Sequence, residues 1–288
     1  MRQSIPEISV AIPARNAADT IAEQLRAVLS QQGAGALEVV VADNGSTDAT
    51  AATVRSMAQL DPRLRLIDAS HDRGEPGTRN AAVAACRAPV VASCDADDVV
   101  RPGWLAEIRK AFANDAHAVH VVRENWSLNA GFEQAGAPRY SMNSWLAGGA
   151  FAIERELFLE LGGFDPALRV GADTEFGFRL LDHAGRHPYR ATAAVVSVRL
   201  PHNSLSTFNR ARSLALTWPE LRRRHPSHMR PTATEAWSVR AQWSLWLLRH
   251  LPSLAGPRRL QWAEVCGTIA GEAEGSIIDA LPGTLRAP

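Results

Sequence analysis

The chain has 288 residues, of which 46% are hydrophobic and 21% charged, and its formal net charge at pH 7 is +1. This composition excludes an intrinsically disordered chain, and the length can hold one large α/β domain with an appendage. A net charge so close to zero excludes the strongly basic character of nucleic-acid-binding proteins, so we expect no nucleic-acid partner.

The cysteines and the apolar segments bear on the compartment. Three cysteines are an odd number and lack metal-ligand spacing, which favours buried thiols in a reducing environment. The first seven residues lack the basic and apolar regions of a signal peptide, and no uncharged apolar stretch approaches the ~20 residues needed to cross a bilayer. We therefore expect a cytoplasmic protein without a membrane-spanning segment.

Short β-like runs alternate with longer helical patterns along the first 122 residues. The predicted strands are residues 8–12, 37–42, 63–67, 89–94 and 118–122, and the predicted helices between them are residues 17–30, 47–60, 76–87 and 102–113. Pro13 is expected to end the first strand. Connections of this length imply right-handed crossovers and a parallel sheet. Residues 123–144 break the pattern and predict a long loop.

Three carboxylates, Asp95, Asp97 and Asp98, follow the fourth predicted strand directly. Ligands bind at the carboxyl ends of the strands of open α/β sheets, and hard oxygen ligands suggest a divalent cation with the phosphate that it neutralises. In an extended chain Asp95 and Asp97 would lie about 6.5 Å apart, so we expect Asp97 to hold the metal and Asp95 to contact another part of the ligand. The alternative is a solvated acidic turn, with Asp98 or Arg101 at the start of the next helix.

Each of the first four predicted strands ends in a polar cluster. The clusters are residues 13–16, 43–48, 73–80 and 95–98. Because these strand ends meet at one edge of the sheet, the clusters should converge on one crevice. Asp43 can accept a hydrogen bond from a nucleobase N–H, and Arg79 can contact a base or a phosphate. A plain turn with Asx caps remains the alternative for residues 43–48.

The sequence resembles glycosyltransferase family 2, the inverting enzymes of the GT-A fold. The resemblance covers residues 8–202, about two thirds of the chain. The matching segments are Ile12–Asn16, Val41–Asp48, Gly77–Asn80, Asp95–Asp97, Gly162–Asp165 and Gly171–Phe176.

This resemblance implies an α/β fold with a Rossmann-like, mostly parallel sheet flanked by helices. It implies that Asp43 and Arg79 hold the nucleobase, Asp95 the ribose side, and Asp97 a Mn²⁺ or Mg²⁺ ion on the diphosphate, with His202 as a further metal ligand. The other residues expected at the donor are Pro13, Arg15, Asn16, Ala96, Gly148 and Gly149.

The resemblance also implies a division of the chain. We expect a catalytic domain over residues 1–220, with a nucleotide-sugar-binding part at 1–122 and an acceptor-binding part at 123–220. A helical extension is expected over residues 221–288.

Asp173 stands where the family places its catalytic base. A carboxylate there can accept the proton of an acceptor hydroxyl as that oxygen attacks the anomeric carbon. The alternative is that Asp173 caps a helix over 174–184, in which Glu175 and Arg179 form a surface ion pair. The family commonly has Glu where this chain has Ala172, so one carboxylate is missing.

The expected function is transfer of one sugar from a nucleotide-diphosphate sugar to an acceptor hydroxyl. The chief alternative, suggested by Ala172, is a catalytically degenerate nucleotide-sugar-binding or scaffold protein on the same fold. A haloacid-dehalogenase-type phosphatase also fits Asp95–Val99, but it needs a later lysine and the only lysine is Lys110, in the next helix. A dinucleotide-binding oxidoreductase is disfavoured because no Gly-x-Gly-x-x-Gly follows the first strand.

The C-terminal residues suggest a contact with another surface. Between Leu221 and Leu260 there are eight arginines against one acid, and a tryptophan-rich segment lies among them. Burial against protein, including a homodimer partner, is one interpretation. Peripheral binding to the inner face of a membrane, which would bring the site to a glycan or lipid-linked acceptor, is the other.

Overall fold

The computed structural model of the protein describes residues 5–72, 74–124, 127–129, 146–200, 204–229, 263 and 265–271. The described residues form two compact units. Those up to residue 128 and from 146 to 199 make the first unit, and residue 129 with those from 200 onward makes the second. The predicted boundary at residue 220 stays a prediction.

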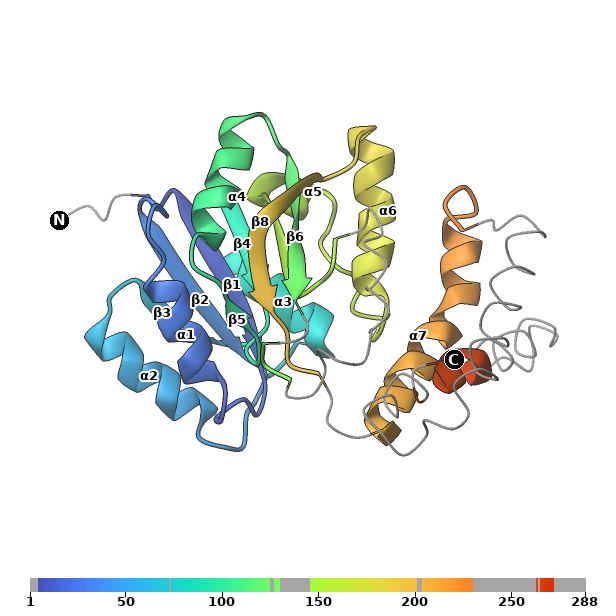
Figure 1. The fold of residues 1–288 in the computed structure, drawn as a ribbon, viewed down its shortest axis with the longest axis horizontal. Helices are drawn as coiled ribbons and strands as arrows, with labels where there is room; N and C mark the ends of the chain where they lie inside the picture. Colours follow the sequence, from blue (N-terminus) through green and yellow to red (C-terminus); the bar gives the residue numbers. More distant parts are fainter. Residues whose placement is uncertain are drawn as a thin grey trace. The chain divides into compact units, whose positions relative to one another are not determined.

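Strands and helices alternate through most of the first unit (Figure 1). The strands are β1 (Ile8–Ala14), β2 (Leu37–Asp43), β3 (Leu64–Asp68), β4 (Val90–Cys94), β5 (Val99–Val100), β6 (Ala118–Glu124), β7 (Ala150–Glu154) and β8 (Tyr189–Ser197). The helices are α1 (Ile21–Leu29), α2 (Thr50–Leu60), α3 (Gly74–Ala85), α4 (Trp104–Ala113), α5 (Arg155–Glu160), α6 (Ala172–Ala184) and, in the second unit, α7 (Ser204–Arg224).

The strands of the described residues form one sheet in the order β3-β2-β1-β4-β7-β6-β8-β5. Four neighbouring pairs are parallel and three are antiparallel. The first four strands form the parallel half, as their βαβ connections predict. The α/β fold class is therefore confirmed, with a mixed sheet in which parallel pairs are the majority.

The sheet differs from the prediction at its centre. The predicted fifth strand, now β6, was expected to extend the parallel sheet, but β7 lies between it and β4 and pairs antiparallel with both. A short apolar run such as β7 gives no periodicity that distinguishes a strand from a buried helix segment. Its insertion brings the residues just before it, at 148 and 149, to the end of β4.

Pro13 does not end β1, contrary to expectation. It lies inside the strand, where it is the register partner of Ala42 in β2. On the other side of β1, pairing with β4 ends at Ala11. Pro13 therefore stands where one flank of the strand has become an edge, and proline is tolerated at such positions because its missing N–H is not needed there.

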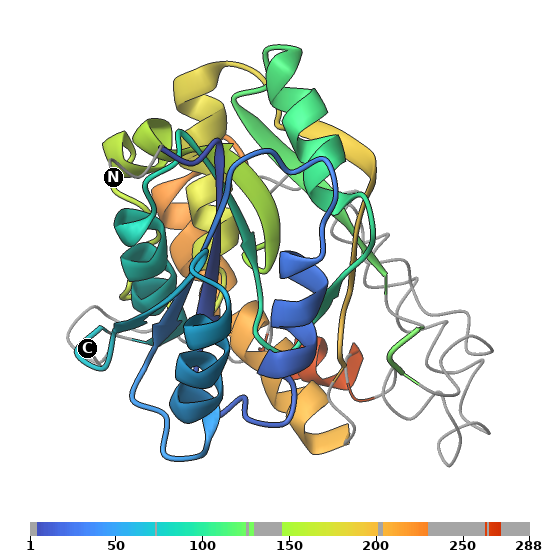
Figure 2. The ribbon, with the colours of Figure 1, turned by 90° about the vertical axis from the view of Figure 1, so that its left-hand side faces the viewer.

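The helices cover both faces of the sheet (Figures 1 and 2). Helices α1 and α2 pack against each other, whereas α3 packs against β1, β2 and α5. The strand order reverses after β3, and right-handed crossovers place helices on opposite faces when the direction of winding reverses. The core between these layers is formed by fully buried strand residues such as Val10, Val40 and Val91.

An aromatic cluster joins β7 to the helices that follow it. Phe151, Phe158, Phe164 and Phe176 have ring centroids 5.0–6.4 Å apart in neighbouring pairs. All four side chains are buried. Because such pairs add to the energy of apolar burial, the cluster fixes α5 and α6 against β7. It thereby fixes the first turn of α6, which carries Asp173.

The second unit contains a close helix pair. Residues 265–271 are helical, and Gly267 and Gly271 face α7 so closely that a Cβ at either would come within 2.4 Å of a backbone oxygen of α7. The tryptophan-rich segment of the C-terminal region lies outside the described residues. None of the helices in the described part of the chain combines the length and apolar character that crossing a bilayer requires.

Candidate active site

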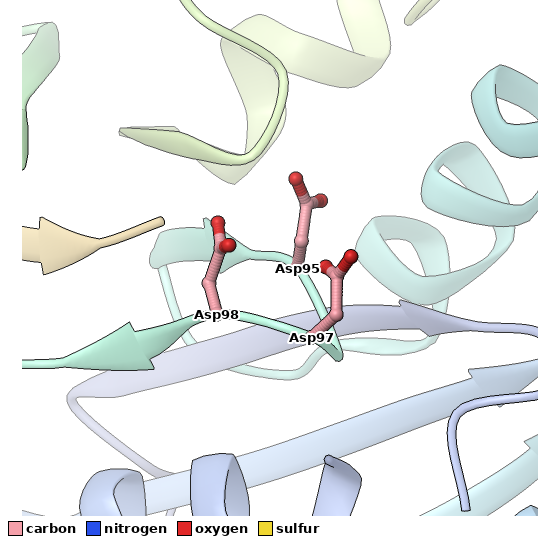
Figure 3. Close-up of side chains that lie close together, drawn as sticks. All are labelled: Asp95, Asp97 and Asp98. Carbon is pink, nitrogen blue, oxygen red and sulfur yellow. The ribbon is translucent and has the colours of Figure 1, made fainter. Parts of the chain in front are cut away.

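The three predicted carboxylates lie on a tight turn at the end of β4. The backbone N–H of Asp98 donates to the carbonyl of Asp95 (3.4 Å), so the chain reverses rather than continuing extended. One oxygen from each of Asp95, Asp97 and Asp98 lies within 4.8 Å of the others, and Figure 3 shows the side chains projecting to the same side. The extended conformation expected between Asp95 and Asp97 is therefore wrong, and the turn brings one oxygen of each carboxylate close enough to share a cation.

Asp98 is part of this cluster. The alternative interpretation, which placed Asp98 at the start of the next helix, is wrong. The Asp98 side chain is 2% exposed, and α4 begins six residues later with Gly103 as its N-cap. Oδ1 accepts a hydrogen bond from the backbone N–H of Arg199 (3.0 Å), whereas the buried Oδ2 has no hydrogen-bond partner among the described residues. Burial, followed by the charges of Asp95 and Asp97, raises the pKa of Asp98 to about 8.

This donor set fits a divalent cation that prefers oxygen. The Asp97 side chain is exposed, but partial loss of hydration in the crowded turn and the charge of Asp95 also raise its pKa. Carboxylates whose pKa values rise because they crowd one another are stabilised when a cation supplies the opposite charge. An unpartnered buried oxygen and three convergent carboxylates suit Mg²⁺ or Mn²⁺, which take hard oxygen ligands.

Arg79 lies in α3 and reaches the acidic turn from within the protein. It is 2% exposed and donates to Asp95 Oδ1 (2.8 Å), Ser93 Oγ (2.9 Å) and Glu75 Oε1 (2.5 Å). Burial alone would lower the pKa of Arg79, but Asp95 and Glu75 raise it above its usual value. Arg79 is thus a permanent buried cation that fixes the orientation of the Asp95 carboxylate.

Gly148 and Gly149 bring the acidic turn and Asp173 to the same place. A Cβ on Gly149 would lie 1.9 Å from Asp95 Oδ2, so only glycine allows this approach. The N–H of Gly148 donates to Asp173 Oδ2 (3.1 Å). A Cβ on Gly148 would lie 3.6 Å from the Cβ of Asp173 and 3.7 Å from Arg79 Nε. The two glycines therefore form the wall shared by Asp95, Arg79 and Asp173.

Asp173 does not cap a helix, contrary to the alternative interpretation. Helix α6 begins at Ala172, and its N-cap is Gly171, with φ of 80°. The Oδ1 atom of Asp173 accepts from the N–H of Thr174 (2.8 Å). Its carboxylate is therefore held by two backbone donors, one from α6 and one from Gly148, and faces the wall formed by the glycines.

Glu175 and Arg179 form more than the surface pair that their spacing predicts. Glu175 is 4% exposed, and Arg179 Nη2 donates to Glu175 Oε2 and to the carbonyl of Gly163, each at 2.7 Å. Arg179 also donates to the carbonyl of Leu161. The pair ties α6 to the loop after α5, so it supports the site from behind.

The ends of β1 and β2 form a second polar wall. Asn16 adopts a left-handed conformation with φ of 51°, its N–H donates to Ser46 Oγ (2.9 Å), and its Oδ1 accepts from the N–H of Thr47 (2.8 Å). Ser46 Oγ donates in turn to Asp43 Oδ1 (2.5 Å). The turn expected at residues 43–48 is present, and Asp43 is held in it by Ser46. Arg15, which directly precedes Asn16 in the sequence, is exposed.

A cavity of about 690 Å³ adjoins this wall. It is lined by Asp43, Gly45, Arg55, Ala58, Gln59, Leu66, Ile67, Asp68 and Ser70. The predicted nucleobase ligand Asp43 thus borders an open volume, whereas the acidic turn does not line it. His202 and residues 125–126 and 130–144 of the predicted loop lie outside the described residues.

The sequence segment that contains these site residues matches a known protein family. Residues 9–171, more than half of the chain, match glycosyl transferase family 2. The chain belongs to this family. The prediction of the family and of its GT-A fold is confirmed. The site is therefore interpreted as that of a glycosyltransferase of this family.

Curated relatives of this family member include two succinoglycan biosynthesis proteins of Rhizobium meliloti. ExoO is 43% identical over 101 residues, which are 35% of this chain and 28% of ExoO. ExoU is 28% identical over 225 residues, which are 71% of this chain and 65% of ExoU. The pre-mycofactocin glycosyltransferase of Mycobacterium tuberculosis is 28% identical over 205 residues, 66% of this chain and 42% of that protein. The chain thus spans from about a quarter to two thirds of these relatives.

Solved structures share the fold. The mannosyltransferase PcManGT of Pyrobaculum calidifontis, in complex with GDP-Man and Mn²⁺, matches with a TM-score of 0.67 at 23% identity, over 96% of this chain and 89% of that one. S. aureus TarS 1–349 in complex with UDP-GlcNAc matches with a TM-score of 0.58 at 15% identity, over 94% and 92% of the two chains. At these identities the likeness establishes the GT-A fold.

The contact of Gly149 with Asp95 leads to a first prediction. Gly149→Ala places a methyl group where the Asp95 carboxylate lies, so that side chain must leave Arg79 or the turn must open. We expect metal-dependent binding of nucleoside diphosphates to weaken by about tenfold or more, as for other residues that orient a metal site. Gly148→Ala is the matched control, because its Cβ meets only ordinary van der Waals contacts. Equal effects of the two substitutions in isothermal titration calorimetry would contradict this account.

The raised pKa of Asp98 leads to a prediction about pH. Between the usual aspartate pKa of 3.8 and the raised pKa of about 8, the folded protein holds a proton on Asp98 that the unfolded chain has lost, so Asp98 destabilises the metal-free fold increasingly as pH rises. The unfolding temperature of Asp98→Asn should therefore exceed that of the wild type by more at about pH 8 than at about pH 5. Mn²⁺ should stabilise the wild type most at the higher pH and the variant little. Differential scanning fluorimetry measures both, and a pH-independent difference would contradict the assignment.

Proposed function

We propose that this chain is an inverting, metal-dependent glycosyltransferase that moves one sugar from a nucleotide-diphosphate sugar to an acceptor hydroxyl. Asp173 is the general base, and Asp97 is the principal metal ligand. The observation that carries the proposal is the shared glycine wall. Gly149 touches the carboxylate of Asp95 while the N–H of Gly148 holds that of Asp173. One site thus offers a cation-binding turn and, beside it, a base.

The donor is assigned to the edge formed by β1, β2 and β4. Asp43, which borders the open cavity, accepts a hydrogen bond from the nucleobase, with Pro13, Arg15 and Asn16 beside it. The base is uracil, thymine or guanine. Arg79 is already satisfied by three acceptors, so it acts on the donor chiefly through the carboxylate of Asp95 that it orients toward the ribose.

The diphosphate is assigned to the acidic turn. Asp97 and Asp98 would hold Mn²⁺ or Mg²⁺ together with the diphosphate oxygens, and Ala96 lies between Asp95 and Asp97 in the turn. When bound, the cation neutralises the charge that builds up on the departing phosphate. Without it, three carboxylates would face the anionic donor directly, at a cost that grows with their burial. His202 remains a predicted further ligand.

Asp173 performs the proton transfer. Its carboxylate accepts the proton of the acceptor hydroxyl while the hydroxyl oxygen forms its bond to the anomeric carbon and the bond to the diphosphate breaks. The two N–H groups that bind Asp173 orient it and leave lone pairs for the acceptor. Attack from the face opposite the leaving group inverts the anomeric centre.

Ala172 is the reason to keep the alternative of a degenerate donor-binding protein. Its side chain is 5% exposed in the first turn of α6, so the missing family carboxylate would have stood in a largely buried position. The base role of Asp173 does not require it, because Gly148 and Thr174 already hold that carboxylate. Cytoplasmic location, a glycan or lipid-linked acceptor, and membrane or homodimer contacts of the C-terminal region remain predictions.

The test of the proposed function is Asp173→Asn. This substitution keeps the size of the side chain but cannot take a proton, so sugar transfer should fall by ~10²-fold or more while donor affinity stays close to that of the wild type. Asp182→Asn, the same change at an exposed position of α6, is the control and should leave both quantities unchanged. Transfer is measured with Mn²⁺ and a panel of UDP-, dTDP- and GDP-sugars.

Two outcomes would overturn parts of this proposal. Near-normal transfer by Asp173→Asn would show that the proton leaves by another route. Donor binding by the wild type, with neither transfer nor donor hydrolysis for any sugar tested, would favour the degenerate donor-binding protein.

A further inference from the structure

Helix α1 carries one polar side chain where its pattern calls for an apolar one. Its buried residues are Ile21, Gln24, Leu25 and Val28, and the side chain of Gln24 is 0% exposed. Burying an amide costs free energy unless its donor and acceptor are both satisfied. Glutamine also loses more side-chain entropy on burial than leucine does. A specific polar contact therefore accounts for glutamine at this position.

That contact is with the backbone of the acidic turn. Gln24 Nε2 donates to the carbonyl oxygen of Asp95 (2.9 Å), and Oε1 accepts from the backbone N–H of Val100 (3.0 Å). The amide thus bridges the residue that opens the turn and the strand β5 that follows it. Asp97 and Asp98 lie between the two bonded points. The Asp95 carbonyl is the same atom that accepts from the N–H of Asp98, so Gln24 holds in place the acceptor of the hydrogen bond that closes the turn.

The neighbouring residue of α1 adds a second link to the cluster. Glu23 pairs with the guanidinium of Arg199, and the backbone N–H of Arg199 donates to Asp98 Oδ1. The Glu23 carboxylate is half exposed, so this ion pair is weak compared with the buried amide bridge. The first turn of α1 therefore contacts the acidic turn at two points. Gln24 binds the backbone of the turn directly, and Glu23 acts through Arg199, whose N–H binds Asp98.

We propose that Gln24 is a positioning residue for the metal and diphosphate site, holding the turn in the shape that brings its three carboxylates together. The proposal rests on the function proposed above. Mutual repulsion between the carboxylates favours opening the turn, and the bridge opposes that opening through the backbone. Residues that orient metal ligands without touching the metal typically contribute 10- to 100-fold to its affinity. Gln24 touches neither metal nor donor, so it acts only through the turn.

The test is Mn²⁺ binding measured by electron paramagnetic resonance in the presence of excess UDP, dTDP or GDP. Gln24→Met, which keeps the length and loses both bonds, should weaken Mn²⁺ binding by about tenfold or more. Gln24→Glu keeps the acceptor for Val100 but places a carboxyl oxygen, in place of the N–H donor, against the carbonyl of Asp95, so it serves where the methionine variant does not fold. It should weaken Mn²⁺ binding as well. Circular dichroism establishes that the variants compared are folded.

Gln31→Met is the matched control. Gln31, just after α1, bridges the backbone in the same way, with Nε2 donating to the carbonyl of Arg101 (3.0 Å) and Oε1 accepting from Leu105 (3.4 Å), but this bridge lies beyond β5. Gln31→Met should leave the Mn²⁺ affinity within about twofold of that of the wild type, a difference in binding free energy of ~0.4 kcal/mol.

The kinetic readout separates positioning from a general effect on folding. In the Gln24 variants the Mn²⁺ concentration for half-maximal transfer should rise, and most of the turnover should return at saturating Mn²⁺. A purely structural role would lower turnover at every Mn²⁺ concentration without moving the half-maximal point. A folded Gln24→Glu or Gln24→Met protein with wild-type Mn²⁺ affinity overturns the role of Gln24 alone. A wild type that binds no Mn²⁺ with UDP, dTDP or GDP overturns the proposed function with it.

Discussion

Three carboxylates crowded on one turn at the end of β4 are the constraint on which the rest of the site depends. Their mutual repulsion and the burial of Asp98 raise the free energy of the turn in the metal-free protein. The same causes raise the pKa values of Asp97 and Asp98. Such an arrangement persists only if the surrounding structure enforces it. The fold provides that enforcement from several sides at once.

Each support comes from a different part of the chain. Arg79 supplies a buried positive charge to Asp95 from α3, and Gly149 closes against the same carboxylate from the segment before β7. Gln24 fixes the backbone of the turn from α1. The antiparallel insertion of β7 brings the two glycines to the end of β4. The aromatic cluster fixes α6 against β7, next to these glycines. The acid cluster and the base at Asp173 are thus placed by one continuous packing arrangement.

Much of this could be predicted from sequence because the relevant signals are local. The βαβ pattern specifies the parallel half of the sheet, and the polar clusters after each strand mark its ligand-binding edge. The spacing around Asp43, Asp95 and Asp173 carries the family resemblance.

The rest depends on contacts between distant residues, which no local pattern encodes. The extended-chain estimate separated Asp95 from Asp97 because a turn closed by Gln24, 71 residues away from Asp95, cannot be foreseen from either segment. The alternative interpretation places Asp98 or Arg101 at a helix boundary, because the burial of Asp98 is a property of the whole fold that the local sequence does not reveal. Even so, a glutamine on the apolar face of a predicted helix could have suggested a buried polar contact.

The acidic turn should bind a nucleoside diphosphate only together with a divalent cation. Differential scanning fluorimetry of the wild type with GDP, UDP and dTDP, each with and without Mn²⁺, tests it most directly, and Asp97→Ala serves as the reference. A matching nucleotide at ~100 times its dissociation constant should stabilise the fold by ~2.7 kcal/mol. The account predicts this stabilisation with Mn²⁺ present and its loss when Mn²⁺ is removed or Asp97 is replaced. The same stabilisation without Mn²⁺, or an unchanged response in Asp97→Ala, would contradict it.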